Sequence, residues 1–167
     1  MKTTLRKIRK IIKEEIDQGT TLIKIDDSLE RCLKMKDLIY DFCNYTCDEL
    51  GIDRDLVDIS IVDNRDRSGI RTTAFYNPQN HKIAVYGKDR AVVDICRSVA
   101  HELTHMQQML ANRIDFPVQD VGGQIEDEAN SKAGEIIKSF AQSEDDRKRI
   151  YENARLRLAP QSLQLAD

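Results

Sequence analysis

The segment between residues 72 and 110 constrains the fold most, because it joins two strand patterns directly to a long helical pattern. The runs 72–76 and 82–86 are β-prone, and the five residues between them include Pro78 and an asparagine. This spacing predicts a β-hairpin. From about residue 89 to 110, apolar residues recur at steps of three and four, which predicts a helix. A hairpin therefore stands immediately before a long helix.

The rest of the chain predicts further helices and one more strand. A strand is expected at 58–62, and helices are expected at 3–17, at 28–50, at 124–142, and from a cap at 143–146 to a point before Pro160. The 28–50 helix has a cap signal in Asp26, Asp27 and Ser28 and a stop signal in Gly51. We expect an α+β fold: one helix-rich domain over 1–167, with a small antiparallel sheet next to the 89–110 helix.

Within that domain we expect N-terminal helices over 1–57, a core over 58–142, and a C-terminal helix and tail over 143–167. A chain of 167 residues with 40% hydrophobic residues is long enough to bury a core of its own. No repeat, low-complexity tract or linker divides it.

Charge and hydropathy exclude several classes of function. A net charge of -3 argues against a nucleic-acid partner, because nucleic-acid-binding domains carry a basic surplus. No run of about 18 apolar residues predicts a membrane span, and the N-terminus lacks the apolar core of a secretory signal, so we expect a cytoplasmic protein. The basic, amphipathic 3–17 segment is interpreted as a surface helix, with a lipid or nucleic-acid contact as the alternative.

The four cysteines do not predict a disulfide framework. Cys43 and Cys47 lie four residues apart and share a helix face, so a shared metal ion is one interpretation. No second ligand pair lies near them in the sequence, and packing in the core is the interpretation we favour. Free thiols are expected throughout.

Two of only three histidines, His101 and His105, flank a glutamate in the segment His-Glu-Leu-Thr-His of the 89–110 helix. Histidines four apart on a helix present both imidazoles to one face, where they can bind one metal ion. Glu102 projects to one side of the pair and suits a general base for a metal-bound water. The alternative is a polar helix face that binds no metal. The spacing itself favours a catalytic zinc site.

Catalytic zinc sites of this type take a third protein ligand, commonly a glutamate. Glu126, in the 124–142 helix, is the strongest candidate, because Asp127 and Glu128 are rotated away from it by about 100° and 200°. Asn130 lies one turn after Glu126 and can accept the other ring N–H of a ligating histidine. The competing interpretation is that these acidic residues only stabilise the N-terminus of a helix, where negative charge is favourable.

The hairpin, the Ala-His-Glu-Leu-Thr-His helix and the later Glu-Asp-Glu-Ala-Asn-Ser-Lys-Ala segment together resemble the ImmA/IrrE-type metallopeptidases, and more distantly the thermolysin-like gluzincins. The resemblance covers residues 72–140. It implies zinc-ligand roles for His101, His105 and Glu126, the general-base role for Glu102, and a supporting role for Asn130. The family often has glycine where Thr104 stands. Because its members act on regulatory proteins, often repressors of mobile elements, the resemblance also suggests a phage-encoded protein.

The predicted function is zinc-dependent hydrolysis of a peptide bond in a protein or peptide substrate. Tyr76 and Tyr86, and with them His81 and Tyr151, are candidates to stabilise the oxyanion. An extended substrate can add to an exposed hairpin edge. One alternative is a catalytically inactive protein of the same fold that binds a partner. Another is a SprT-like, DNA-associated protease, which would need His81 as its third ligand.

Overall fold

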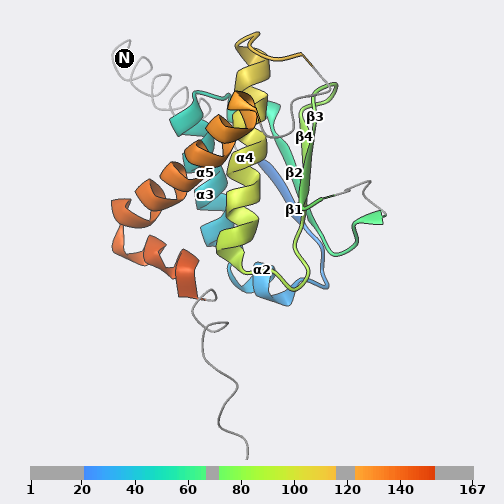
Figure 1. Cartoon of the computed structure of the whole chain (residues 1–167). Helices are drawn as coiled ribbons and strands as arrows, with labels where there is room; N and C mark the ends of the chain where they lie inside the picture. The colour runs from blue at the N-terminus through green and yellow to red at the C-terminus, as the bar shows by residue number, and fades with distance from the viewer. Residues whose placement is uncertain (1–20, 67–71, 116–122, 153–167) are drawn as a thin grey trace, which may run out of the picture.

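The computed structural model of the chain describes residues 21–66, 72–115 and 123–152 (Figure 1). Its strands are β1 (Leu22–Ile25), β2 (Asp58–Val62), β3 (Ala74–Asn77) and β4 (Lys82–Tyr86). Its helices are α2 (Glu30–Lys34), α3 (Lys36–Leu50), α4 (Val92–Leu110) and α5 (Gln124–Ser143), with short 3-10 helices η1 (Arg54–Leu56) and η3 (Asp145–Tyr151). The predicted 3–17 helix lies outside the described residues.

A four-stranded sheet in the order β1-β2-β4-β3 forms one layer of the molecule. β1, β2 and β4 are parallel, and β3 pairs antiparallel with β4. The register aligns Ile23, Ile59, Ile83 and Tyr76 in one row across the sheet, and all four are buried. Because alternate strand residues point to opposite faces, this row marks the face that packs against helices.

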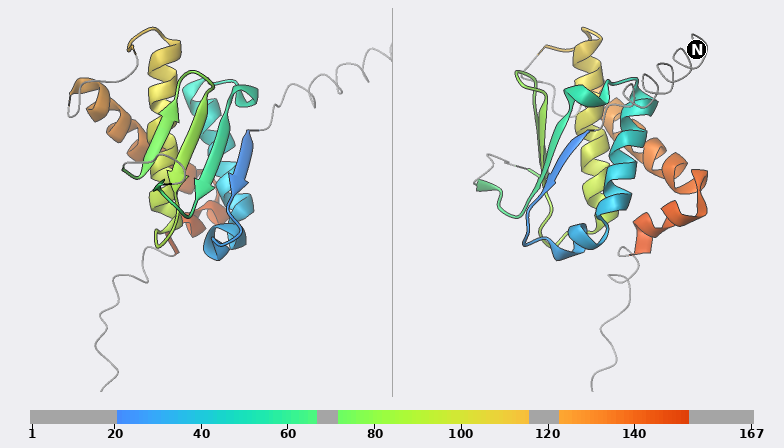
Figure 2. Two further views of the ribbon diagram at one scale, coloured as in Figure 1. Left: turned by 90° about the vertical axis from the view of Figure 1, so that its right-hand side faces the viewer. Right: turned by 180° about the vertical axis from the view of Figure 1, so that it is seen from behind.

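The helices stack on that face of the sheet in two further layers (Figures 1 and 2). α4 contacts β3 and β4, while α3 and α5 pack against α4. Phe42 of α3 and Phe140 of α5 are fully buried and meet edge to face, with ring centroids 5.2 Å apart. In the left view of Figure 2 the opposite face of the sheet is turned to the viewer, and none of the described helices covers it.

Much of the predicted element order is confirmed. The fold is α+β, with strands at Asp58–Val62 and Lys82–Tyr86 as expected, and β3 and β4 form the predicted hairpin. The long helix before residue 110 and the helix from Gln124 are both present. Gly51 ends α3 in the left-handed conformation, with a φ of 65° that glycine adopts without the steric cost of a Cβ.

The expected antiparallel sheet is wrong: the sheet is mixed, and β1 was not predicted. The connection from β1 to β2 contains α2 and α3, which is the length of crossover that parallel strands need. At four residues, β1 is too short for its alternation to stand out in the sequence. Since β1 belongs to the same sheet as β2, the described part of 1–57 is part of the core.

The predicted 28–50 helix is two helices, α2 and α3, separated at Met35. The predicted cap is also wrong, because the N-cap is Leu29 and no side chain caps the helix. The Ser28 hydroxyl instead donates to the Asp63 carboxylate, and the Asp26 carboxylate accepts the Asp63 N–H. These side chains tie the loops after β1 and β2 together, so they are not available to cap α2.

The last predicted helix begins as the 3-10 helix η3, and residues 153–167 lie outside the described ranges. None of the helices in 21–66, 72–115 and 123–152 combines the length and the hydrophobicity that a membrane span requires. All four cysteines are free and buried, as the packing interpretation predicted.

Candidate metal centre

The side chains of His101 and His105 meet on the surface of α4 that faces α5. The two residues are four apart, so the helix places them one turn from each other on the same side. Their Nε2 atoms are 3.0 Å apart, and the rings are nearly perpendicular, with an angle of 85° between their planes. His105 is the more deeply buried of the two, with 8% of its side chain exposed against 20% for His101.

Glu126 completes the cluster from the first turn of α5. Its Oε2 atom lies 3.3 Å from Nε2 of His101, and its Oε1 atom lies 3.2 Å from Nε2 of His105. Buried Ala129 and Ala133 follow on the same helix face and allow α5 to approach α4 closely. The structure thus brings together the three residues that the sequence singled out.

The spacing of the two imidazole nitrogens and the Glu126 carboxylate is close to that of a tetrahedral zinc site. Zinc binds histidine nitrogen and carboxylate oxygen at about 2.0–2.2 Å, so neighbouring ligand atoms of a tetrahedral site lie about 3.3 Å apart. The two Nε2 atoms are 3.0 Å apart, and each lies near a different oxygen of the Glu126 carboxylate, at 3.3 Å for His101 and 3.2 Å for His105. Two imidazoles and one carboxylate are also the donor set of catalytic zinc sites that keep a position open for water.

The tautomer of His105 is fixed by Gln108, a fully buried residue on the next turn of α4. The Gln108 amide nitrogen donates to the Ile125 carbonyl at 3.2 Å, so its oxygen Oε1 faces Nδ1 of His105, at 2.9 Å. Nδ1 must therefore carry the proton and donate it, which leaves a lone pair on Nε2. That is the form of imidazole that binds a metal.

A longer chain of polar contacts extends this arrangement to the surface. The Gln108 amide nitrogen also donates to Oε2 of Glu128 at 3.1 Å. The Glu128 carboxylate in turn accepts two hydrogen bonds from the guanidinium of Arg113, at 2.7 and 2.8 Å, and this pairing lowers its pKa. Glu128 therefore supports the site through Gln108, whereas Asp127 is exposed.

Burial, and then the neighbouring His105, lower the pKa of His101, so the ring is held in its neutral form. The carboxylate of Glu126 and a hydrogen bond with the side chain of Asn130 act in the opposite direction. A hydrogen bond that raises a histidine pKa is one in which the partner accepts. Asn130 is thus placed against His101 in the geometry expected for a supporting residue.

Glu102 lies beside the three converging side chains and is held by the sheet. Its carboxylate accepts a hydrogen bond from the backbone N–H of Tyr76 in β3. Burial, followed by the negative charge of Glu126, raises the pKa of Glu102 to about 7, and the Tyr76 N–H partly offsets this. A carboxyl group with a pKa near 7 can both take up and release a proton at neutral pH.

A cleft of about 470 Å³ opens beside Glu102 and His101. Its walls come from the N-terminal half of α4, from residues 72–74 at the start of β3, and from Asn130 of α5. Its lining residues include four that are not among the predicted site residues: Thr72, Ala74, Arg97 and Ser98. Arg97 and Ser98 precede His101 by four and three residues, which is the helical spacing that could have identified them.

The predicted oxyanion candidates do not line this cleft. The Tyr76 hydroxyl lies 3.0 Å from Nδ1 of His81 and contacts Sδ of Met109, near the far end of α4. The Tyr86 ring packs under the guanidinium of Arg65, and Tyr151 packs against the core. His81 stands outside the histidine–glutamate cluster, so the geometry that a SprT-like site requires is not present among the described residues.

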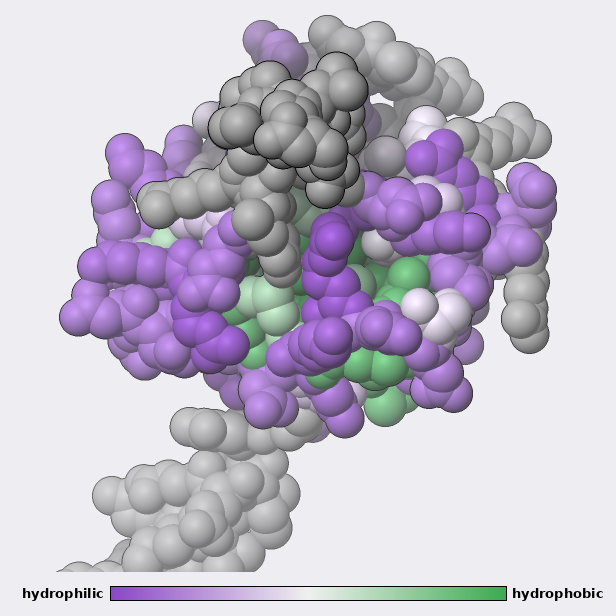
Figure 3. Space-filling model, turned by 90° about the horizontal axis from the view of Figure 1, so that it is seen from below, coloured by the Kyte–Doolittle hydropathy of each residue, from purple (hydrophilic) through white to green (hydrophobic). Residues whose placement is uncertain are grey.

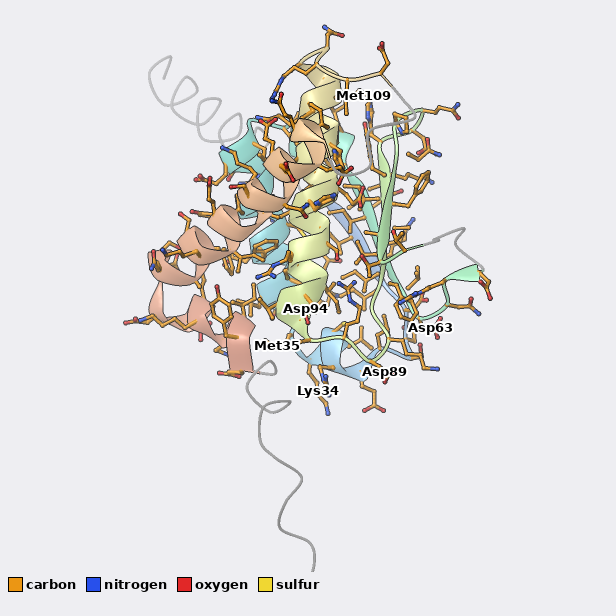
Figure 4. All side chains as sticks on the ribbon, in the orientation of Figure 1. Lys34, Met35, Asp63, Asp89, Asp94 and Met109 are labelled. Carbon is orange, nitrogen blue, oxygen red and sulfur yellow. The ribbon has the colours of Figure 1, made fainter. Side chains whose placement is uncertain are left out.

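A second cleft, of about 560 Å³, lies at the lower end of the molecule in Figure 1, between α2 and the loop 87–90, and it shares Arg90 with the first cleft. Figure 3 views this end, where hydrophilic side chains surround a smaller apolar area. Lys34, Met35 and Asp89 mark the same end in Figure 4. None of the predicted site residues lines this cleft.

Comparison of the chain with protein-family models, with curated proteins and with solved structures gives no match.

Proposed function

We propose that this protein is a zinc-dependent metallopeptidase, in which His101, His105 and Glu126 hold the ion and Glu102 transfers the proton. The observation that carries the proposal is the convergence of two imidazole nitrogens and a carboxylate at the separations of a tetrahedral site. A structural zinc site would close its fourth position with protein and would not need Glu102. Here a cleft opens beside His101 and Glu102.

Zinc bound at these residues would supply a Lewis acid that polarises a peptide carbonyl and acidifies water. The side chains of the protein would transfer the proton and orient the ligands. Glu102, held by the Tyr76 N–H, would remove a proton from the attacking water and pass it to the leaving amine nitrogen. Gln108 would keep the Nε2 lone pair of His105 directed at the ion, and Asn130 would steady His101.

The edge of the sheet supports a peptide as the substrate. β3 is an edge strand, and its Thr73 carbonyl accepts the Tyr86 N–H, so odd-numbered residues face β4. Ala74 and Tyr76 therefore direct their N–H and carbonyl groups away from β4, and Tyr76 uses its N–H to bind Glu102. An extended peptide that pairs with this edge would lie beside Glu102.

The test measures metal content and peptide hydrolysis on protein purified without chelators or a histidine tag. We expect about one zinc ion per chain. Glu126→Ala should lose most of the metal, while the matched control Asp127→Ala, which changes an exposed carboxylate on the same helix turn, should keep it. Glu102→Gln should keep the metal and lose hydrolysis by roughly a hundredfold or more.

Two results would contradict the proposal in different ways. Wild-type protein that takes up no zinc, even when zinc is added, would show that the cluster is not a metal site. If neither the zinc-loaded wild type nor Glu102→Gln cleaves any peptide of a diverse library, the result would favour the catalytically inactive binding protein.

A further inference from the structure

The cleft beside the candidate metal centre runs along α4 from the site toward the N-terminal end of this helix. His101 and Glu102 line one part of it, and Asp94, Arg97 and Ser98 line the part nearer the start of the helix. Thr72 and Ala74, at the beginning of β3, form the opposite wall. A substrate at the site therefore has this cleft as a continuous binding surface.

β3 and α4 run in the same direction past the site. The hydroxyl of Tyr76, late in β3, contacts Met109 near the C-terminal end of α4. Thr72 and Ala74, at the start of the strand, share the cleft with Arg97 in the N-terminal half of the helix. Asp94 and Met109 mark the two ends of α4 in Figure 4.

This shared direction orients a bound peptide. Antiparallel pairing is slightly more stable per residue than parallel pairing. A peptide that adds antiparallel to β3 has its carboxyl-terminal half next to Thr72 and Ala74. That half of the peptide then passes Arg97.

The two arginines that line the cleft differ in their hydrogen bonding. Arg90 donates to the carbonyls of Tyr86 and Asp94 and to the hydroxyl of Ser98, so it helps to build the wall. Arg97 is exposed, and its guanidinium makes no hydrogen bond or ion pair with any residue in 21–66, 72–115 or 123–152.

The position of Arg97 also fits a peptide that occupies the site. Arg97 precedes His101 by one helical turn, which is about 6 Å along the helix axis. An extended peptide advances about 3.3 Å per residue, so the same distance corresponds to about two residues. The Asp94 carboxylate is the only acidic group among the lining residues of this part of the cleft, against the two guanidinium groups of Arg90 and Arg97.

We infer that Arg97 binds a carboxylate of the substrate on the carboxyl-terminal side of the scissile bond, and that the protein selects peptides with an acidic group there. The inference rests on the proposed function. The carboxylate is either an aspartate or glutamate side chain one to three residues after the bond, or the C-terminal carboxylate of a peptide that ends there. Arginine suits both, because its planar guanidinium forms paired hydrogen bonds with a carboxylate.

The experiment compares cleavage-site profiles of a peptide library digested by zinc-loaded wild type, Arg97→Ala and Arg97→Glu. Arg149→Ala is the matched control, since it removes an exposed arginine of η3 that lines neither this cleft nor the candidate metal centre. The wild type should enrich aspartate and glutamate, or free C-termini, within three residues after the cleaved bond. Arg149→Ala should keep that profile, and Arg97→Glu should shift it toward lysine and arginine.

A second measurement uses single peptides with aspartate, asparagine or lysine at the selected position, each with a free or an amidated C-terminus. Arg97→Ala should lower kcat/KM for the acidic peptide by roughly tenfold or more, mainly through KM, because a charge-assisted hydrogen-bonded pair is lost. It should barely change the asparagine peptide. Sensitivity to amidation alone identifies the C-terminal carboxylate, and sensitivity to the side chain alone identifies the internal acid.

The outcomes separate this inference from the proposed function. Cleavage that depends on Glu102 but shows no acidic preference, or a preference that survives Arg97→Ala, overturns the inference and leaves the proposed function standing. If neither the wild type nor Glu102→Gln cleaves any peptide, both the inference and the proposed function are overturned.

Discussion

Nδ1 of His105 lies 2.9 Å from Oε1 of Gln108, and the nitrogen of the same amide donates to the carbonyl of Ile125, which directly precedes Glu126. One buried side chain thus orients a histidine on α4 and holds the first turn of α5, where the third candidate ligand is placed. Hydrogen bonds of this kind hold a ligating histidine in the tautomer that the metal needs. Gln108 is therefore a positioning residue for two of the three ligands.

Gln108→Leu should weaken zinc binding by about 10- to 100-fold, which is the usual cost of removing such a partner. The change removes the acceptor for His105 and the link to α5 while nearly preserving side-chain volume. The measurement is a zinc titration in competition with a chromogenic chelator. The matched control is Gln107→Leu. The Gln107 amide donates to the Leu50 carbonyl, so it is bonded neither to a candidate ligand nor to the first turn of α5.

Thermal unfolding of the zinc-free variants separates affinity from folding. Gln107→Leu and Gln108→Leu each remove hydrogen bonds of a largely buried amide, so both should be destabilised by about 1–3 kcal/mol. Only Gln108→Leu should lose zinc affinity. Equal affinities for the two variants would show that Gln108 does not position the ligands.

The sequence predicted the residues of the cluster better than it predicted the residues that orient them. His101, Glu102 and His105 form a local pattern whose geometry follows from 3.6 residues per turn, and the same periodicity on a second helix distinguishes Glu126 from Asp127 and Glu128. It also places Asn130 one turn after Glu126. Gln108 lies three residues from His105, but a glutamine on a helix has many possible partners, and only the docking of α5 fixes which one it takes.

Tertiary contacts also explain the incorrect predictions about the sheet and α2. The parallel pairing of β1 with β2 depends on where α2 and α3 place the chain, and no local pattern records this. Asp26 and Ser28 have the composition of a helix cap, yet both bind Asp63 from a loop 35 or more residues away. Local propensity is weak evidence when a long-range partner competes for the same side chain.

The approach of α5 to α4 depends on small side chains, and this gives a second prediction. Ala133 has no exposed surface, and it lies two turns after Glu126 on the face that packs against α4. Ala133→Leu should overpack this contact and cost about 1–3 kcal/mol of unfolding free energy. Because α5 must move outward to accept leucine, Glu126 should move away from the histidines.

The expected result is therefore a loss of zinc affinity together with a loss of stability. The matched control is Lys138→Leu, which adds a leucine at an exposed position of the same helix and should leave both quantities nearly unchanged. Both quantities are measured by zinc titration and by urea unfolding. Unchanged zinc affinity in a destabilised Ala133→Leu protein would show that the α4–α5 spacing does not set the position of Glu126.

The buried cysteines make stability depend on alkaline pH. Burial raises the pKa of the Cys47 thiol to about 11, and burial raises the pKa of Cys43 and Cys96 as well. An unfolded thiol ionises near pH 8.5, so the folded state favours the neutral form more strongly than the unfolded state does. The resulting stability is fully present below about pH 8 and is lost as the pH rises toward the folded pKa.

Cys47 alone should account for a loss of about 2 kcal/mol in unfolding free energy between pH 7.5 and pH 10. Urea unfolding of the zinc-free protein, with a phosphine reductant, measures this loss. Cys47→Ala should be less stable than the wild type at pH 7.5. Its loss of unfolding free energy between pH 7.5 and pH 10 should be about 2 kcal/mol smaller than that of the wild type. Ile39→Val is the control, because it weakens the same buried region without removing a titrating group and should retain the wild-type pH dependence. If Cys47→Ala and the wild type lose equal stability between the two pH values, the Cys47 thiol does not contribute to the alkaline sensitivity.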